Sequence, residues 1–543
     1  MQGLMMDGAL TITSVLEHAE RIHGHQEIVS VTAESPRHRY TYRECFARAR
    51  RLASVLAGLG IGPGDRVATL AWNDYRHMEV YYGVACSGAI CHTINPRLFA
   101  EQLAWIVNHA EDRVLVIDPM FLPLVAKLRP QLPTLEQVIV LCSEAAMPAA
   151  DGLELLCYET LLAGADEDFA WPALDERAAA SLCYTSGTTG HPKGVLYSHR
   201  AMVLISWACG LPDAMNLSAR EVVLPVVPMF HVNAWSIPYS ALMVGAKLVM
   251  PGPKMGDGET LANLMDEEAV TVALGVPTVW QGLLEFLEQA GRRLKTLKRT
   301  VVGGSACPLS MMEQFEQRHG VWTHHAWGMT ELSPLGTYNT PPPDYDSLPR
   351  EARDRLRASQ GQPVYGVEMK IVGPDGQALP WDGKAFGALK VRGPWVASSY
   401  YRMEGESAAH DAEGWFDTGD VATIDPRGYM TITDRTKDVI KSGGEWISSI
   451  ELENIAVSHP AVSRAAVIGV AHPKWDERPL LLVVPAAGAQ PSAEEILAAF
   501  EGKVARWMIP DAVEFIEDMP LTATGKISKL TLRERFAEYR LEG

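Results

Sequence analysis

Positive charge is scarce in this 543-residue sequence. Lys and Arg number 48 against 66 Asp and Glu, which gives a formal net charge of −18. A surplus of negative charge argues against nonspecific binding to nucleic acid and against docking on anionic membranes. We therefore expect any anionic ligand to be bound by a local group of positive side chains.

Paired cysteines and long apolar runs are also missing. The eight cysteines form no CxxC pair, and none follows Cys307. Scattered thiols in a long chain predict a reducing compartment and argue against a disulfide framework or a zinc site. The first residues do not join a basic start to an apolar core, and no apolar run approaches the ~18 residues that cross a bilayer. We expect a cytoplasmic protein without an integral membrane segment.

The composition is that of a compact folded protein, with 47% hydrophobic and 21% charged residues, and its length predicts two or more domains. Helical and strand-like stretches alternate from the start, which predicts stacked βαβ units around largely parallel sheets. From Gly387 the chain becomes rich in strand and turn residues, so a small antiparallel subdomain is expected. Charged residues at 434–438 mark a boundary, after which a small α+β domain is expected.

The expected elements follow from apolar spacing. A buried strand from 222 is expected to end at Phe230 and His231, where the histidine is either a core residue with polar partners or part of a site. The expected helices are 12–22, 42–59, 77–87, 99–109, 450–458, 492–506 and 529–540, and the other expected strands are 67–72, 89–92, 114–117, 464–470, 480–485 and 512–516.

A loop of small hydroxyl and glycine residues runs from Thr185 to Gly194, after a strand that ends at Tyr184. Glycines let backbone N–H groups converge, hydroxyls add donors, and Lys193 adds positive charge, so the loop is suited to phosphate. A mobile connection is the alternative for a loop of this kind. It is not a Walker A loop, because Lys193 follows proline and precedes glycine.

Two other signals fail on inspection. The stretch GGSACP resembles the start of a nucleophile elbow, but Cys307 stands where that motif needs glycine. His324 and His325 are adjacent, so a strand would point them in different directions and a shared metal ion is not expected.

Five segments together resemble the adenylate-forming superfamily of acyl-CoA synthetases, luciferases and adenylation domains. They are YTSGTTGHPKG (184–194), WGMTE (327–331), GWFDTGD (414–420), DRTKDVIKSGGEWIS (434–448) and TATGKISK (522–529), and they occur in the family's order. VVPMFHVNAW and KSGGEWIS are similar to the medium- and long-chain fatty-acid branch, which includes relatives that act on methylmercaptopropionate. The resemblance implies a large N-terminal domain, 1–434, with the ATP and acyl sites. A small mobile C-terminal domain, 435–543, would carry the catalytic lysine.

The resemblance implies a two-step reaction with ATP, Mg²⁺ and coenzyme A. A carboxylate attacks the α-phosphorus of ATP to give acyl-AMP and pyrophosphate, and the thiol of coenzyme A then attacks the acyl carbonyl. Because an anion approaches a tetra-anion, the site must concentrate positive charge along the reaction line. A medium-chain fatty acid is the favoured substrate. The alternatives are a methylmercaptopropionate-CoA or aryl-CoA ligase and, in a different class, a non-catalytic acyl or nucleotide sensor. Homodimers are common in this branch.

Site residues follow from the same resemblance. Lys526 would bridge the carboxylate and the α-phosphate, Thr185 and Glu331 would contact magnesium, and His231 would complete the catalytic group. The implied nucleotide contacts are Thr185, Ser186, Gly187, Thr188, Thr189, Gly190, Lys193, Gly304, Ser305, Ala306, Trp327, Gly328, Met329, Thr330, Asp420, Arg435, Lys437 and Lys441.

The acyl and coenzyme A sites are implied around the strand end and the later glycine pair. His231 follows Phe230 where amino-acid-activating relatives carry aspartate, so an ammonium-bearing substrate is disfavoured. Trp327 replaces the family's usual tyrosine, and Ala388 stands where many relatives have glutamate. The implied acyl and coenzyme A contacts are His231, Val232, Asn233, Trp235, Gly303, Pro334, Ser442, Gly443, Gly444 and Trp446.

Overall fold

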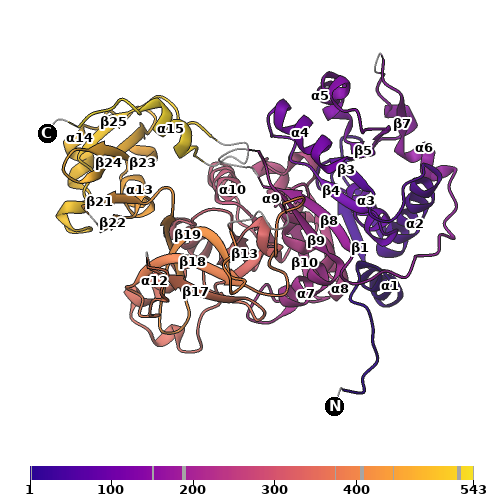
Figure 1. Ribbon diagram of the computed structural model, residues 1–543, viewed down its shortest axis with the longest axis horizontal. Coiled ribbons are helices and arrows are strands. Elements are labelled where there is room, and N and C mark those ends of the chain that lie inside the picture. The colour runs from indigo at the N-terminus through magenta and orange to yellow at the C-terminus, as the bar shows by residue number, and fades with distance from the viewer. Residues whose placement is uncertain are drawn as a thin grey trace. The chain divides into compact units, whose positions relative to one another are not determined.

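The chain folds into two compact units. The computed structural model describes residues 1, 3–149, 152–185, 191–373, 375–403, 409–443, 445–521 and 527–541. The first unit comprises Met1–Glu368 and Arg392–Ala408, and the second comprises Met369–Val391 and Ala409–Gly543. Figure 1 labels the elements of each unit along the chain. No helix in the described ranges is long and apolar enough to cross a membrane.

One sheet of the first unit has seven strands in the order β7-β6-β5-β3-β4-β8-β9. All neighbours are parallel except β8 and β9, which form an antiparallel pair. The parallel core confirms the expected βαβ organisation. Its strands are β3 (Arg66–Leu70), β4 (Ile90–Thr93), β5 (Val114–Ile117), β6 (Gln137–Val140), β7 (Leu155–Cys157), β8 (Ala179–Tyr184) and β9 (Gly194–Ser198).

The other sheet of the first unit has nine strands in the order β16-β15-β14-β13-β12-β10-β11-β1-β2. Its central strands are parallel, and the pairs β1–β2, β14–β15 and β15–β16 are antiparallel. The strands are β1 (Glu27–Ser30), β2 (His38–Thr41), β10 (Val222–Pro225), β11 (Lys247–Met250), β12 (Val272–Gly275), β13 (Arg299–Val302), β14 (Trp322–Gly328), β15 (Leu335–Tyr338) and β16 (Gln362–Pro363).

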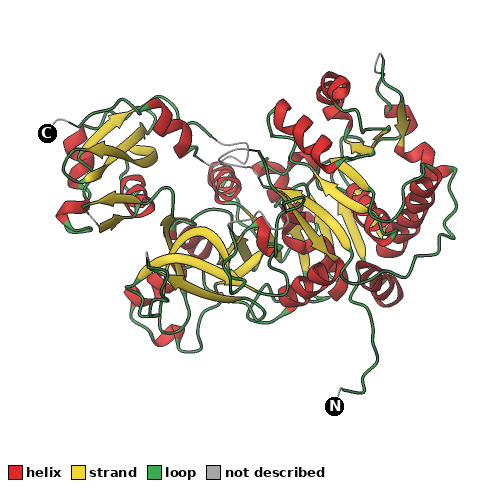
Figure 2. Cartoon of the chain, in the orientation of Figure 1, coloured by secondary structure: helices red, strands yellow, loops and turns green. Residues whose placement is uncertain are grey.

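Helices cover both sheets of the first unit (Figure 2). Every residue of α3 is buried, because this helix packs on β4 and β8 of one sheet and on β1 of the other. The four helices expected before residue 110 are confirmed as α1 to α4. The helices of this unit are α1 (Ile12–His23), α2 (Tyr42–Gly58), α3 (Tyr75–Cys86), α4 (Ala100–Ala110), α5 (Leu122–Leu128), α6 (Tyr158–Ala163), α7 (His199–Gly210), α8 (Ile237–Val244), α9 (Gly258–Glu267), α10 (Pro277–Gln289), α11 (Leu309–Gln314) and α12 (Arg350–Ala358).

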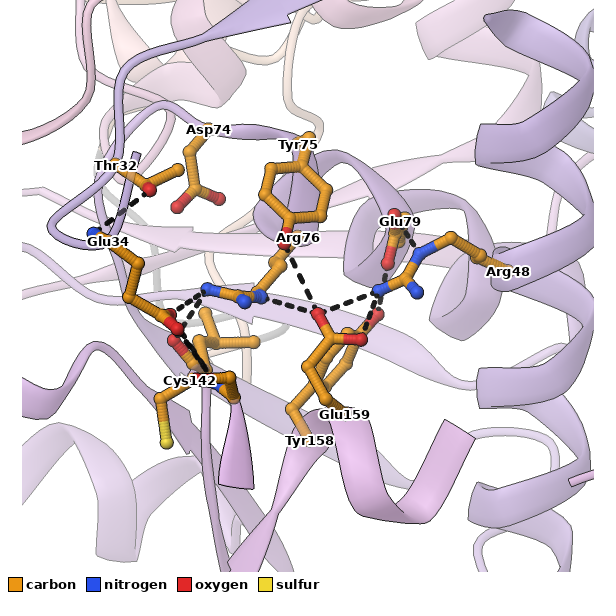
Figure 3. A network of polar contacts seen from close by, with 12 residues as sticks. Thr32, Glu34, Arg48, Asp74, Tyr75, Arg76, Glu79, Cys142, Tyr158 and Glu159 are labelled. Atoms are coloured by element: carbon orange, nitrogen blue, oxygen red, sulfur yellow. Dashed lines mark hydrogen bonds and ion pairs between the residues drawn. The ribbon is translucent and has the colours of Figure 1, made fainter. Parts of the chain in front are cut away.

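A buried network of charged groups joins α2, α3 and α6 (Figure 3). Arg48 Nε donates to Glu79 Oε1 at 2.7 Å, and the Tyr158 hydroxyl donates to Glu79 Oε2 at 2.8 Å. Glu159 accepts from both Arg48 and Arg76. Burial raises the pKa of Glu79 to about 7, and Arg48 opposes that shift. Because a buried charge without a partner is costly, the network fixes how the three helices pack.

The second unit holds two smaller sheets. The first has the order β17-β18-β19-β20, in which β18, β19 and β20 pair antiparallel, as expected from the turn-rich sequence. The second has the order β22-β21-β24-β23, with β25 parallel to β24. The strands are β17 (Glu368–Val372), β18 (Phe386–Arg392), β19 (Phe416–Ile424), β20 (Met430–Arg435), β21 (Ile440–Ser442), β22 (Glu445–Ile447), β23 (Val462–His472), β24 (Asp476–Pro485) and β25 (Ala512–Phe515).

Helices α13 (Ser449–Val457), α14 (Ala493–Ala498) and α15 (Lys529–Arg535) cover the last of these sheets. Alternation along β23 sends Val467 into a core with α13 and α14, and Ile468 into a core with α15. The α+β character expected after the boundary is therefore confirmed.

Three expected elements are wrong in extent. The strand predicted from 222 ends at Pro225, and a short turn of 3-10 type spans Val232–Ser236. The helix predicted over 492–506 stops at Ala498, where two 3-10-like bends follow, and the last helix ends at Arg535 in place of 540. Pro225 and Pro228 explain the first error, because proline cannot donate to a central strand ladder.

Candidate functional site

The ends of the glycine loop are held together as a neck. Tyr184 on β8 pairs with Gly194 on β9, Thr185 N donates to the Lys193 carbonyl at 2.9 Å, and Lys193 N donates to Thr185 Oγ1 at 3.3 Å. A side chain at 194 would come within 3.2 Å of Tyr184, Leu182 and Tyr401, so glycine is needed there. Thr185 and Lys193 are thus brought together. Residues 186–190, which include Ser186, Gly187, Thr188, Thr189 and Gly190, lie outside the described residues.

Three stacked rings hold the far end of this loop against α4. The rings of His191 and Trp105 stack at 4.6 Å with 7° between their planes, and Trp105 stacks on His109 at 4.4 Å with 15°. His109 Nδ1 and the Tyr184 hydroxyl share a hydrogen bond of 2.6 Å, and burial lowers the pKa of His109. A cavity of about 350 Å³ opens beside Lys193 and these rings. The stack gives the loop a rigid support.

A carboxylate and an ammonium meet one tyrosine at the end of this loop. Glu331 is 5% exposed, and its Oε1 accepts from the Tyr400 hydroxyl at 2.7 Å. Lys193 Nζ lies 4.8 Å from the centroid of the Tyr400 ring. The sequence motifs predicted Glu331 and Lys193 for the site. In the structure both contact Tyr400, a residue that the motifs did not include.

The turn that carries Glu331 is fixed by its neighbours. The Tyr197 hydroxyl on β9 donates to the Thr330 carbonyl at 2.7 Å, and Ala397 N donates to the Glu331 carbonyl at the same distance. Met329 N donates to the Pro334 carbonyl at 3.0 Å, and a side chain at Gly328 would collide with that carbonyl. The WGMTE segment is therefore fixed in place beside β9.

The oxygens at this point suit magnesium. Glu331 offers a carboxylate and Thr185 a hydroxyl, both hard donors, and Mg²⁺ binds through one or two such groups while it keeps several waters. Among the residues that the structure describes, no cluster of three or more His, Cys, Asp or Glu side chains is placed to hold a metal ion. A magnesium ion held by Glu331 and Thr185 would take its remaining ligands from water and phosphate oxygens.

Three of the implied nucleotide contacts, Gly304, Ser305 and Ala306, follow β13. Gly304 has φ +80°, a conformation that glycine adopts at no cost, and Ser305 and Ala306 after it are exposed. Burial lowers the pKa of His325 to about 4, so this ring stays neutral while it bonds the Ser305 backbone. Trp327 is nearly buried, and its ring lies against Gly336.

Residues 232–236 form a left-handed turn at the predicted acyl wall. Val232, Asn233, Ala234, Trp235 and Ser236 all have φ between +46° and +62°. Each such residue costs roughly 1–2 kcal/mol for an L-amino acid, and strain of this kind gathers at functional sites. The sequence analysis missed this turn, because apolar content alone does not distinguish it from a strand.

The turn brings two predicted wall residues into contact. A Cβ at Gly303 would lie 3.0 Å from the Trp235 indole, so glycine lets this ring approach the end of β13. Asn233 points toward β8, where its Oδ1 accepts from Ser181 at 3.1 Å. The Ser236 hydroxyl donates to the Ser333 carbonyl at 2.9 Å, next to Pro334. His231 is half-buried where the turn begins.

In the second unit two of the implied nucleotide contacts, Asp420 and Arg435, form an ion pair. Asp420 on β19 and Arg435 on β20 are register partners, and Arg435 Nε lies 2.8 Å from Asp420 Oδ1. Asp420 is 4% exposed, whereas the Arg435 side chain is 43% exposed. The pair leaves a buried carboxylate orientated by a partly accessible guanidinium.

The KSGG loop of the second unit is held by residues that sequence motifs did not indicate. Arg478 Nη1 donates to Ser442 Oγ at 3.1 Å, and Gly443 N donates to the Trp475 carbonyl at 2.8 Å. Gly443 has φ +61°, and the Trp475 ring lies against it. Lys437 and Lys441 are exposed, and Trp446 lies on β22. Gly444 and Lys526 lie outside the described residues.

Comparison with known proteins matches this chain almost end to end. The model of the AMP-binding enzyme family matches residues 16–401, and that of the AMP-binding enzyme C-terminal domain matches 451–526. The 3-methylmercaptopropionyl-CoA ligase of Ruegeria lacuscaerulensis is 54% identical over 99% of both chains. The medium-chain-fatty-acid–CoA ligase of Ectopseudomonas oleovorans is 52% identical over 100% of this chain and 98% of its own. ATP-bound MatB from Rhodopseudomonas palustris superposes with a TM-score of 0.83 at 25% identity, over 97% of this chain and 99% of that one.

Proposed function

Because the chain belongs to the AMP-binding enzyme family, we propose that it activates a carboxylic acid with ATP and transfers the acyl group to coenzyme A. Acyl-AMP and pyrophosphate form first, and acyl-CoA and AMP follow. The observation that carries the proposal is the similarity to an acid–CoA ligase, which is 54% identical to this chain over 99% of both chains. The meeting of the glycine-loop neck, Lys193 and Glu331 supports it independently.

The proposed chemistry gives each group a task. Backbone N–H groups and Lys193 bind phosphate, and Glu331 with the Thr185 hydroxyl holds magnesium, which neutralises phosphate charge when bound. The Lys526 ammonium contacts both the substrate carboxylate and the α-phosphate, and so stabilises the negative charge as it moves from one to the other. Asp420, orientated by Arg435, accepts from the ribose hydroxyls.

We propose a medium-chain fatty acid as the substrate and methylmercaptopropionate as the second candidate, since the two relatives with these activities are nearly equal in identity. One CH₂ is worth ~0.8 kcal/mol of burial, so small changes around Trp235 and Gly303 shift the preference by several carbons. An aryl-CoA ligase is a further alternative. We also propose that the enzyme acts in the cytoplasm, where its eight free cysteines stay reduced, and that it forms the homodimer common in this branch.

The test is release of pyrophosphate by the purified protein with ATP, magnesium and a panel of acids. Saturated acids of increasing length are compared with methylmercaptopropionate and benzoate at equal concentration. A maximum of kcat/KM at intermediate length supports the main proposal, and a maximum with the thioether acid supports the second. The absence of release with any acid would favour a non-catalytic nucleotide sensor.

A further inference from the structure

We infer that Tyr400 is a positioning residue that holds Glu331 and Lys193 ready for a metal-bound triphosphate. This inference rests on the proposed function, because it assigns the two charges to the phosphate end of the nucleotide. No sequence motif that predicted the site includes Tyr400. Its role is argued from the contacts it makes with both charges.

The tyrosine bonds each charge through a different part of its side chain. The hydroxyl donates to Glu331 Oε1 at 2.7 Å, while the ring face lies 4.8 Å from Lys193 Nζ. The ring supplies the negative face that an ammonium prefers.

The backbone around Tyr400 is fixed from both sides. Ala397 N donates to the Glu331 carbonyl at 2.7 Å, and Tyr401 N donates to the Gly194 carbonyl at 2.8 Å. The short segment 397–401 therefore joins the turn of Glu331 to the neck of the glycine loop. With 7% of its surface exposed, the Tyr400 side chain has little freedom to leave this position.

These contacts predict different effects for the two parts of the tyrosine. A hydrogen bond to one oxygen sets the rotation of the Glu331 carboxylate, which matters when a metal ion must be bound with nearly octahedral geometry. The ring restrains the Lys193 ammonium, which matters for triphosphate with or without metal. A tyrosine that only fills space would affect both forms of nucleotide alike.

Binding calorimetry on the full chain separates these effects. ATP is titrated once with excess magnesium and once with EDTA. Tyr400→Phe keeps the ring and loses the donor, so we expect affinity for magnesium-ATP to fall about tenfold, the effect of one hydrogen bond to a charged group, with ATP in EDTA within about twofold of wild type. Tyr400→Leu loses both the donor and the ring, so its affinity for ATP should fall in both titrations. In the titration with magnesium, the affinity of Tyr400→Leu should be about threefold lower than that of Tyr400→Phe.

Tyr239→Phe is the matched control, because it deletes another buried tyrosine hydroxyl, on α8. It should bind ATP like wild type in both titrations. If Tyr400→Phe binds magnesium-ATP like wild type, or weakens both titrations equally, the inference is overturned. Tyr400→Phe decides the matter even if Tyr400→Leu does not fold, as judged from its thermal transition.

The test of Tyr400 can succeed or fail independently of the test of the proposed enzymatic function. A wild-type protein that releases no pyrophosphate with any acid overturns the enzymatic proposal, while a magnesium-selective loss of ATP affinity in Tyr400→Phe would still support the role of Tyr400. In an active enzyme, Tyr400→Phe should raise the magnesium concentration needed for half-maximal pyrophosphate release, and added magnesium should restore kcat.

Discussion

His199 is kept neutral by a backbone group. Ile12 N, at the start of α1, donates to His199 Nδ1 at 3.2 Å, so this nitrogen must carry a lone pair. The side chain is buried, and burial lowers its pKa from 6.5 to about 4. Protonation of His199 Nδ1 would leave the Ile12 N–H, one of the N–H groups without a partner inside helix α1, with no acceptor.

This arrangement predicts a pH dependence of stability. Between pH 6.5 and about 4 the unfolded chain binds a proton at residue 199 that the folded chain does not, so stability is lost as the pH falls through this window. His199→Gln keeps an acceptor that does not titrate. Urea unfolding at pH 7.5, 6 and 5 should show a pH slope reduced by up to ~1.4 kcal/mol per pH unit relative to wild type. Parallel slopes would contradict the prediction.

Substitution of Arg48 tests how much the buried network of Figure 3 contributes to stability. The Glu79 side chain is fully buried against Arg48, so Arg48→Met leaves a carboxylate that must be buried without its partner or take up a proton. We expect the free energy of unfolding to fall by ~3–5 kcal/mol, as for other broken buried pairs. Denaturant unfolding measures it.

The matched control is Arg37→Met, which breaks the more exposed pair with Glu267 and should cost under ~1 kcal/mol. Adding Glu79→Gln to Arg48→Met should recover part of the loss, because the amide carries no charge. Equal losses from the two arginine substitutions would show that burial of the pair is not what matters.

At the scale of elements, α9 and α10 end in the same motif with different residues. Val270 N donates to the Met265 carbonyl and Arg292 N donates to the Leu287 carbonyl, the six-residue bond of a Schellman ending. The left-handed position is Gly291 in α10, with φ +61°, but Ala269 in α9, with φ +55°.

Ala269→Gly should therefore stabilise the first unit. The exposed methyl of Ala269 makes the left-handed conformation costly, and its removal outweighs the extra freedom of glycine in the unfolded chain. We expect a gain of ~0.5–1 kcal/mol in denaturant unfolding. Ala290→Gly, one residue earlier in the α10 motif at φ −82°, is the control and should not stabilise. A loss in both variants would refute the strain argument.

The sequence predicts regular elements better than contacts between them. Apolar spacing sufficed for α1 to α4 and for the parallel strands, because a buried face must repeat with the period of its element. It failed after Pro225, where strand-like residues lead into a left-handed turn at 232–236 that only tertiary packing can stabilise. Tyr400 gave no signal either, since its partner Glu331 is 69 residues away and the pairing depends on how the segments fold.

For the whole molecule, we propose that the boundary predicted at 434–438 is a hinge about which the small C-terminal domain rotates between the two reaction steps, as the family resemblance implies. In the second unit this stretch is tied to the C-terminal helices. Ser449 Oγ donates to Asp434 Oδ2 at 2.7 Å, and Arg533 Nη2 donates to the Lys437 carbonyl at 3.1 Å. Asp434 and Arg435 also pair with β19, so the stretch 434–438 lies between the β17–β20 sheet and the C-terminal helices, where the proposed hinge would act.

Lys437→Pro tests the hinge. Proline fixes its own φ and restricts Thr436 before it, so we expect thioester formation from supplied acyl-AMP to slow by on the order of tenfold, with adenylation less affected. Separate assays of pyrophosphate release and acyl-CoA formation measure the two steps. Lys437→Ala removes the side chain but keeps backbone freedom, so it should leave the ratio of the two rates as in wild type; the same ratio in Lys437→Pro would rule out a hinge here.

The left-handed turn at 232–236 has a consequence for the order of folding. Local preference in each of its five L-residues favours the opposite hand, so the turn cannot nucleate by itself and must wait for Ser181, Gly303 and Ser333 to surround it. We infer that the wall that would select the acid takes its native shape only once these segments have packed around it, so discrimination among acids depends on the assembled first unit and not on the local sequence.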